Sequence, residues 1–358
     1  MVIIMVKKVG TFVSINRMIT SNRHPIASVI DIEKKSGDIN IDLLIDLAKQ
    51  GLPKDDLVLR LYTWEIFLHV RPLDRSKWES NTENQFKMYW TWVSKYFESA
   101  PDWVDRIIPV SDVKIKDFGL SHNDVMTQIH GDLIRTPTEN FTEIGLGDSD
   151  EAIRPHIRRI ERILYIFSCL NAAYSYTQGF NELAYPIYHV AINAHRKLGN
   201  SDDVGEVAAF YLLQNLITGT GLGDLFTMDQ DFDAVSSRFD MIREMLKIAD
   251  TELYNYLFLK LNASPLQFAF SWVSVLFHEL YKVDALLILW DRFLLKESNI
   301  VEFGMAIAAA HLVEQREMIL NCTFSDLMDR LHNLENLDPA TIIARAEDIW
   351  AQYIETDH

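Results

Sequence analysis

The sequence predicts an all-α fold made of many packed helices. Apolar residues recur at intervals of three and four along most of the chain, which is the spacing of one helix face. No stretch sustains the strict alternation of apolar and polar residues that is typical of a half-buried strand. The breaks between the helical segments are short. A chain with this pattern buries its apolar faces by packing helix against helix.

The composition indicates a folded globular chain with an acidic balance. Of the 358 residues, 48% are apolar and 24% are charged, which is ordinary for a globular protein. Lysine and arginine together number 34 against 51 aspartates and glutamates, which gives a formal net charge of −17. A field of this sign repels nucleic acid and anionic lipid. We therefore expect no nucleic-acid partner.

The cysteines and histidines do not suggest a metal or disulfide framework. Cys169 and Cys322 are too few for either, and we expect two small buried thiols in a reducing compartment. The pair His278-Glu279 lacks the second histidine of a zinc-binding His-Glu-x-x-His motif, so no metal site is expected. No run approaches the 18 consecutive apolar residues of a membrane span.

The first part of the chain has no clear period. We expect residues 1–38 to be an N-terminal extension, either one strand or an arm that packs on the body. From Ile41 the pattern becomes helical and ends at Gly51, a residue type that commonly stops helices. Pro53 is expected to open the next helix, because proline suits the first helical turn.

The helix expected after Pro53 carries an apolar stripe at Leu57, Leu61, Trp64 and Leu68. Arg60 and Trp64 are four positions apart, so the guanidinium can stack on the indole and brace the fold.

An aromatic-rich region follows. Four of the eight tryptophans lie between Trp78 and Trp103. The simplest interpretation is one helix, roughly Asn84 to Ser99, held on the body by its large apolar area. The alternative is a partner-binding surface.

The run from Ile129 to Pro137 places a carboxylate one helical turn before an arginine. Asp132 and Arg135 share a helix face, so the carboxylate can hold the guanidinium through a bidentate bond. Pro137 disfavours helix at the preceding residue, which puts Arg135 at or just past a helix end. Residues 137–151 are polar and are expected to form an exposed loop. The alternative for Asp132 and Arg135 is an ordinary surface ion pair near a helix C-terminus.

A strongly helical segment comes next, with its apolar stripe at Ile153, Ile157, Ile160, Leu164 and Phe167. Its polar side carries four arginines, namely Arg154, Arg158, Arg159 and Arg162. We expect these arginines on a solvated face. The alternative is that they approach a binding groove.

The stretch from Tyr176 to Glu182 separates this segment from another helix, expected from Leu183 to Leu198. Gln178 therefore lies in a short connection or at a helix start. Its amide offers both a donor and an acceptor, so it can orient a water molecule or cap a backbone group. Gly179 lets another part of the chain come close.

Two further breaks follow. Residues 193–206 are polar and are expected to form a linker. The cluster Gly219-Thr220-Gly221-Leu222-Gly223 marks a boundary between two helical lobes, which we place at about 39–218 and 219–355. The cluster is not a dinucleotide-binding fingerprint, because Asp224 stands where the third glycine would be.

These motifs resemble, in their order, those of the TBC-domain family of Rab GTPase-activating proteins. Gly51-Leu52-Pro53 followed by Arg60 and Trp64 matches the opening Arg-x-x-x-Trp motif. The arginine-finger motif is matched by Ile129, Asp132 and Arg135, and the glutamine-finger motif by Tyr176, Gln178, Gly179 and Asn181. The segment 265–272 and the pair Trp290-Asp291 resemble later helices, so the resemblance covers roughly residues 39–353.

The resemblance implies a TBC domain over residues 39–355, with two helical lobes and a V-shaped groove between them. It implies a GTPase-activating protein for a GTP-bound Rab, with Arg135 on the phosphates and Gln178 beside the attacking water. Supporting roles fall to Ile129, Asp132, Tyr176, Gly179 and Asn181, and a structural role to Arg60 and Trp64. The partner would bring GTP and Mg²⁺, so no cofactor of the chain's own is expected.

The same resemblance implies a cytoplasmic protein of vesicle trafficking that is recruited peripherally to endomembranes. The alternative is a catalytically silent TBC-like scaffold that binds a Rab or another partner.

Three positions depart from the family pattern. Ser271 replaces an arginine, His278-Glu279-Leu280 replaces Arg-Glu-Phe, and Phe180 replaces a methionine. We expect none of them to touch the two fingers.

Overall fold

The computed structural model describes residues 24–97, 122–227, 232–332, 334 and 337–356. Over these residues the chain is helical, as predicted, and the extended backbone pairs in one isolated bridge, between Asp38 and Asp74. In chain order the α-helices are α1 Pro25–Ile30, α2 Ile41–Ala48, α3 Leu57–Phe67, α4 Trp78–Tyr96, α5 His122–Leu133, α6 Thr138–Glu143, α7 Asp150–Leu170, α8 Phe180–Lys197, α9 Asp202–Gly219, α10 Asp224–Thr227, α11 Phe232–Phe239, α12 Met241–Ala249, α13 Thr251–Tyr254, α14 Pro265–Ser274, α15 Val283–Leu294, α16 Ile300–Glu314, α17 Arg316–Ile319, α18 Phe324–His332 and α19 Pro339–Thr356. Short 3₁₀ helices are η1 Arg75–Lys77, η5 His278–Leu280 and η6 Glu297–Asn299, and a π-helix, η4, spans Asn255–Lys260.

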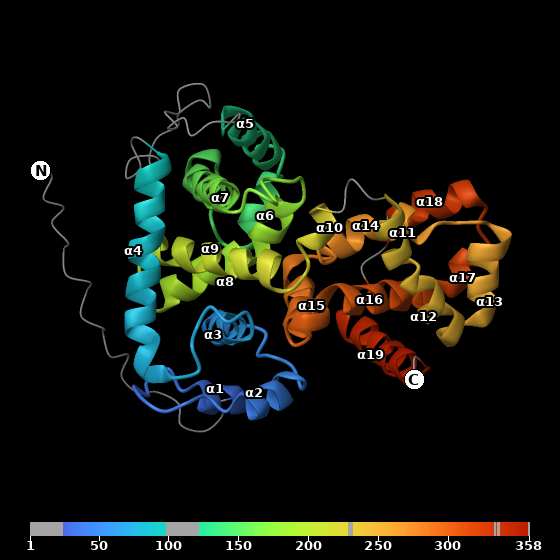
Figure 1. Cartoon of the computed structure of the whole chain (residues 1–358), viewed down its shortest axis with the longest axis horizontal. Helices are drawn as coiled ribbons and strands as arrows, with labels where there is room; N and C mark the ends of the chain where they lie inside the picture. Colours follow the sequence, from blue (N-terminus) through green and yellow to red (C-terminus); the bar gives the residue numbers. More distant parts are fainter. Residues whose placement is uncertain (1–23, 98–121, 228–231, 333, 335–336, 357–358) are drawn as a thin grey trace, which may run out of the picture.

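The helices gather into two lobes (Figure 1), with α1 to α9 at one end of the molecule and α10 to α19 at the other. The chain passes between them just after α9, through the predicted glycine cluster. Gly223 is needed there because a Cβ atom at this position would lie 2.6 Å from Tyr174 and 2.7 Å from the carbonyl oxygen of Ile217. We retain 39–218 and 219–355 as the proposed limits of the lobes.

The extension predicted at residues 1–38 contributes α1, which packs on α2 and α3 of the N-terminal lobe and buries Ile26 and Ile30. Residues 1–23 lie outside the described part of the chain. The predicted helix start at Pro53 is wrong, because α3 begins at Leu57. The carboxylate of Asp56 accepts the amide of Leu59 at 3.0 Å and so caps the helix there.

The aromatic-rich helix is α4, and it starts six residues earlier than predicted, at Trp78. Its inner side packs on α7 and α9, where Tyr89 is fully buried. The first turn is held by Trp78, whose ring contacts Tyr62 at 5.4 Å. Trp103 lies outside the described residues.

The predicted exposed loop at residues 137–151 is wrong. Its first part forms the short helix α6, and Phe141, Ile144 and Leu146 are buried. The hydroxyl of Tyr185 on α8 donates to the carbonyl of Asn140, which fixes α6 over α8. Only Phe141 of these three lies within α6, so no apolar period in the sequence reveals this helix of six residues.

The arginines of α7 do not form a solvated face, and none of the four lines the groove described below. Arg162 is fully buried and donates to both carboxylate oxygens of Glu206 at 2.5 Å. Arg159 donates to Glu206 at 2.6 Å and to Asp203 at 2.7 Å. The predicted linker at 193–206 is also wrong, because α8 runs to Lys197 and α9 begins at Asp202 with Glu206 on its buried side.

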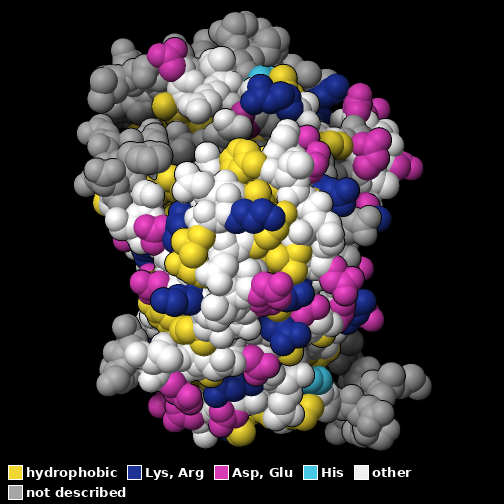
Figure 2. Space-filling view, turned by 90° about the vertical axis from the view of Figure 1, so that its right-hand side faces the viewer, with side chains coloured by type: hydrophobic (Ala, Val, Ile, Leu, Met, Phe, Trp, Pro, Cys, Tyr) yellow, Lys and Arg dark blue, Asp and Glu magenta, His cyan; other side chains and the backbone are white. Residues whose placement is uncertain are grey.

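The C-terminal lobe is built around α16, which packs against α12, α14, α15 and α19. Its sides are buried almost all round, as the sequence predicts for residues 301–313. Figure 2 views the right-hand end of Figure 1, which carries α13, α17 and α18, and shows acidic, basic and apolar side chains interspersed there. Among the described helices, none combines the length and apolarity that crossing a bilayer requires.

Candidate functional site in the groove between the lobes

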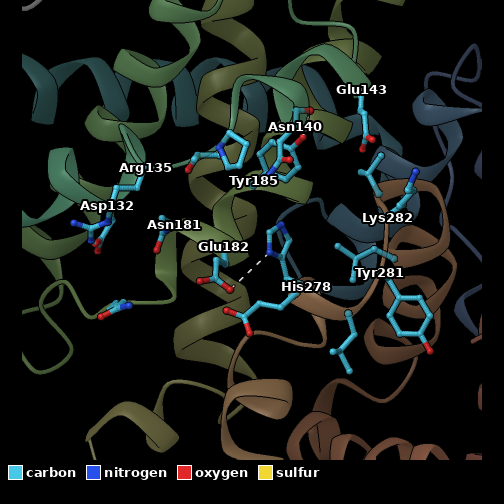
Figure 3. A pocket seen from close by; sticks show the side chains of 17 residues that line it. Asp132, Arg135, Asn140, Glu143, Asn181, Glu182, Tyr185, His278, Tyr281 and Lys282 are labelled. Atoms are coloured by element: carbon cyan, nitrogen blue, oxygen red, sulfur yellow. Dashed lines mark hydrogen bonds and ion pairs between the residues drawn. The ribbon is translucent and has the colours of Figure 1, made fainter. Parts of the chain in front are cut away.

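A groove of about 600 Å³ opens between the two lobes. Its walls come from the end of α5, from α6 and from the start of α8 on one side, and from η5 and the start of α15 on the other (Figure 3). The residues that line it are Asp132, Arg135, Thr136, Pro137, Asn140, Glu143, Gln178, Asn181, Glu182, Tyr185, His278, Glu279, Leu280, Tyr281, Lys282, Val283 and Leu286.

Arg135 stands just past the end of α5, as the proline two residues later predicts. Its side chain is 70% exposed. Nη2 donates to Oδ1 of Asp132, but the bond is single, so the predicted bidentate pair is wrong. Ile129, one turn before Asp132, is fully buried and faces the body. The motif is therefore held in the core by Ile129, while the guanidinium of Arg135 reaches solvent.

The second oxygen of Asp132 is engaged elsewhere, which explains the single bond. The hydroxyl of Tyr176 donates to Oδ2 of Asp132 at 2.7 Å. Burial, and then the hydrogen bond to Asp132, raise the pKa of Tyr176, so this hydroxyl keeps its proton as a donor. Two motifs that lie 44 positions apart are thus joined through one carboxylate.

Gln178 lies on the loop before α8, and its side chain is exposed in the groove. Gly179 follows as the N-cap residue with a φ of +105°, a conformation that favours glycine. Oδ1 of Asn181 accepts the amide of Gly179 at 3.2 Å and also lies 3.2 Å from the Tyr176 hydroxyl. The loop is therefore held from both sides, and the Gln178 amide makes no hydrogen bond within the described part of the chain.

The opposite wall carries charged side chains from the C-terminal lobe. Nδ1 of His278 lies 3.7 Å from Oε2 of Glu182, and the two side chains face one another in Figure 3. Partial burial, and then the neighbouring Glu182 carboxylate, raise the pKa of Glu279. Lys282 is exposed at the same wall.

Comparison with known proteins identifies the family to which the chain belongs. Residues 109–320, more than half of the chain, match the sequence model of the Rab-GTPase-TBC domain. The chain belongs to this family. It is 26% identical to TBC1 domain family member 22A of Macaca fascicularis, over 84% of this chain and 56% of that protein. It is 22% identical to TBC1 domain family member 13 of Homo sapiens, over 93% of this chain and 99% of that protein.

Solved structures agree on the fold of this TBC domain. The YPT/RAB-GAP domain of Gyp1p superposes with a TM-score of 0.72 at 19% identity, covering 92% of this chain and 98% of that one. The Chlamydomonas flagellar RabGAP TBC domain gives a TM-score of 0.59 at 16% identity, covering 88% of each chain.

The two residues of the Arg-x-x-x-Trp motif lie away from the groove. Arg60 and Trp64 are buried in α3. They do not stack on each other as predicted. Both donate instead to Asp291 of α15, the aspartate of the Trp-Asp pair.

The wall of the groove that the C-terminal lobe contributes in this TBC domain was not predicted from the sequence. The expectation that the departing positions do not touch Arg135 and Gln178 stays a prediction, but two of the three lie near these residues. His278, Glu279 and Leu280 line the same groove as Arg135 and Gln178. Phe180 directly follows Gly179 and packs its ring on Phe226 at 4.8 Å. The sequence signal that could have pointed to this wall was the departure of residues 278–280 from the family's Arg-Glu-Phe.

Proposed function

We propose that this TBC domain is a GTPase-activating protein for a Rab-family GTPase, and that Arg135 and Gln178 complete the partner's active site in trans. The observation that carries the proposal is that the side chains of Arg135 and Gln178 line one groove, although the two residues lie 43 positions apart in the sequence. The family membership of the chain supports the class of partner.

Arg135 would neutralise the charge that develops on the transferring phosphoryl group. An arginine supplied in trans is worth about 10³ to 10⁵ in rate, which corresponds to roughly 4 to 7 kcal/mol of barrier. Its exposure leaves it free to reach a partner, while the bond to Asp132 limits the directions it samples. Lysine would replace it poorly, because a point charge lacks the planar fork of the guanidinium.

Gln178 would orient the attacking water. A carboxamide can accept one hydrogen bond from the water and donate another to a phosphate oxygen. Asp132, Tyr176 and Asn181 would act by fixing the two loops, since they connect the arginine motif to the glutamine motif.

In this proposal the partner carries GTP and Mg²⁺, and the chain provides neither a cofactor nor a turnover of its own. The place of action would be the cytoplasmic face of an endomembrane where the Rab resides.

The test is hydrolysis by a panel of GTP-loaded Rabs, measured as phosphate release with and without the wild-type chain, together with direct binding of each Rab. We expect at least one Rab whose hydrolysis is accelerated at least 100-fold. A Rab that binds while its hydrolysis rate stays unchanged would select the scaffold alternative.

A further inference from the structure

His278 lies where the C-terminal lobe meets the start of α8. Its Nδ1 is 3.7 Å from Oε2 of Glu182, and its ring stands edge-on to that of Tyr185 at 5.6 Å. Glu182 and Tyr185 are three positions apart and share one helix face. A single side chain from η5 therefore contacts the first two turns of α8 (Figure 3).

These turns are continuous with the loop that carries Gln178. The amides of Glu182 and Leu183 both donate to the carbonyl of Gly179 at 3.1 Å. Displacing Glu182 therefore displaces Gly179 and its neighbour Gln178. Nδ1 of His278 and Oε2 of Glu182 are both buried, and neither has a hydrogen-bond partner within the described residues, so each atom faces the other as its polar neighbour.

The turn that presents His278 is itself tightly held. Leu276 and Phe277 have φ values of +49° and +64°, in the left-handed region that non-glycine residues rarely adopt. The indole of Trp290 donates to the carbonyl of Leu276 at 3.1 Å, and the Phe277 ring stacks on His311 at 5.1 Å. Strained backbone of this kind persists only where the surroundings fix it, and it concentrates at functional sites. The core of the C-terminal lobe thus determines where His278 stands.

The same lobe also contacts the loop itself. A Cβ atom on Gly179 would lie 3.1 Å from Val275 and 3.6 Å from Phe226. The loop of Gln178 is therefore packed against the lobe that carries His278.

Resting on the proposed function, we propose that His278 is a positioning residue for Gln178. Through Glu182 it holds the first turn of α8, and so it sets where the carboxamide stands in the groove. The C-terminal lobe thereby controls the glutamine finger, whereas Arg135 is controlled by Asp132 within the N-terminal lobe.

A double-mutant cycle tests this assignment. Single-turnover hydrolysis by a responsive Rab is measured with wild type, His278→Ala, Gln178→Ala and the double variant, over a range of domain concentrations. We expect His278→Ala to lower the maximal rate about 10-fold with little change in the half-saturating concentration, since small misplacements of a catalytic group are costly. In the Gln178→Ala background, His278→Ala should lower the rate no further. In the Arg135→Ala background, the fold-losses of the two variants should multiply.

Two variants keep the cycle interpretable. His278→Arg places a nitrogen donor of similar reach opposite Glu182 and should retain most of the wild-type rate. Lys282→Ala removes an exposed charge from the same wall and should raise the half-saturating concentration equally with and without Gln178. Unfolding midpoints of all variants, compared with wild type, separate positioning from loss of fold, and His278→Gln replaces His278→Ala if the latter unfolds.

The outcomes are distinct. No acceleration of any Rab by the wild type would overturn the proposed function and this inference with it. Acceleration by the wild type, together with an equal effect of His278→Ala in the presence and absence of Gln178, would overturn the assignment of His278 alone.

Discussion

Arg60 and Asp291, 231 positions apart in the chain, form a buried ion pair that joins α3 of the N-terminal lobe to α15 of the C-terminal lobe. Nε and Nη2 of Arg60 both donate to the carboxylate, at 3.0 to 3.2 Å, and the indole of Trp64 donates to it at 2.8 Å. The Asp291 carboxylate is therefore one of the contacts that hold the two walls of the groove in place relative to each other.

Removing one partner of this pair should be strongly destabilising. Arg60→Ala leaves the Asp291 carboxylate buried without its cation, which typically costs about 3–5 kcal/mol. The free energy of unfolding from chemical denaturation measures this cost. Arg345→Ala is the matched control, because its pair with Glu314 is at the surface and should be worth about 1 kcal/mol or less. Equal losses in the two variants would contradict the proposed brace.

Tyr176→Phe should uncouple the two motifs. The change leaves Oδ2 of Asp132 without its donor, which costs about 1–3 kcal/mol when the acceptor is buried. We expect the maximal rate of Rab hydrolysis to fall about 10-fold, because Asp132 no longer ties the arginine turn to the glutamine loop. Tyr211→Phe, whose hydroxyl bonds the carbonyl of Gln85 far from the groove, is the control and should leave the rate unchanged. A full rate in Tyr176→Phe would show that the connection is dispensable.

Gly179→Ala should strain the backbone and should also push the loop of Gln178 out of its packed position. Gly179 and Gly51 have nearly the same φ, +105° and +104°. A Cβ atom meets Val275 at 3.1 Å in the first case and finds open space in the second. Both alanine variants should therefore lose about 1 kcal/mol of stability or more, but only Gly179→Ala should slow hydrolysis. The measurement compares the hydrolysis rates reached with Gly179→Ala and Gly51→Ala under conditions in which both variants are equally stable. Equal rates would exclude a role for the packing of the Gln178 loop.

Stability should fall as the pH drops from about 6.5 to about 4. Burial is the main cause that lowers the pKa of His156, His189, His195 and His311 to about 4 in the folded chain. The unfolded chain, in which a histidine has a pKa near 6.5, binds more protons across this window. The stability is therefore fully present above about pH 6.5 and is lost as the pH falls toward 4.

Each of these histidines contributes about 1.4 kcal/mol per pH unit within the window. Denaturation at several pH values between 4.5 and 7 in wild type and His195→Gln measures the contribution of one of them. The variant should show the smaller dependence on pH, and an unchanged slope would mean that His195 is not buried in its neutral form.

The sequence predicted those parts of the site that are determined locally. Pro137 ends the helix near Arg135, and Gly179 allows the sharp start of α8, so Arg135 and Gln178 could each be placed near a helix end from their own neighbours. The apolar stripe of α7 was equally clear, because its period runs without a break from Ile153 to Phe167.

The parts that depend on distant partners could not be predicted in this way. The arginines of α7 have the spacing of a solvated face, and only the fold brings Glu206 to them from another helix. The same holds for Asp291, the distant carboxylate to which both Arg60 and Trp64 donate. The position of His278 in the groove of Arg135 and Gln178 could not be predicted, because nothing local places η5 beside α8.

The most direct test of the central claim compares the maximal single-turnover rate of one responsive Rab with wild type, Arg135→Ala and Gln178→Ala, with Arg345→Ala as an exposed arginine outside the groove. The account predicts that Arg135→Ala loses about 10³-fold or more, that Gln178→Ala loses at least 10-fold, and that both still bind the Rab. Wild-type rates with either variant would contradict it.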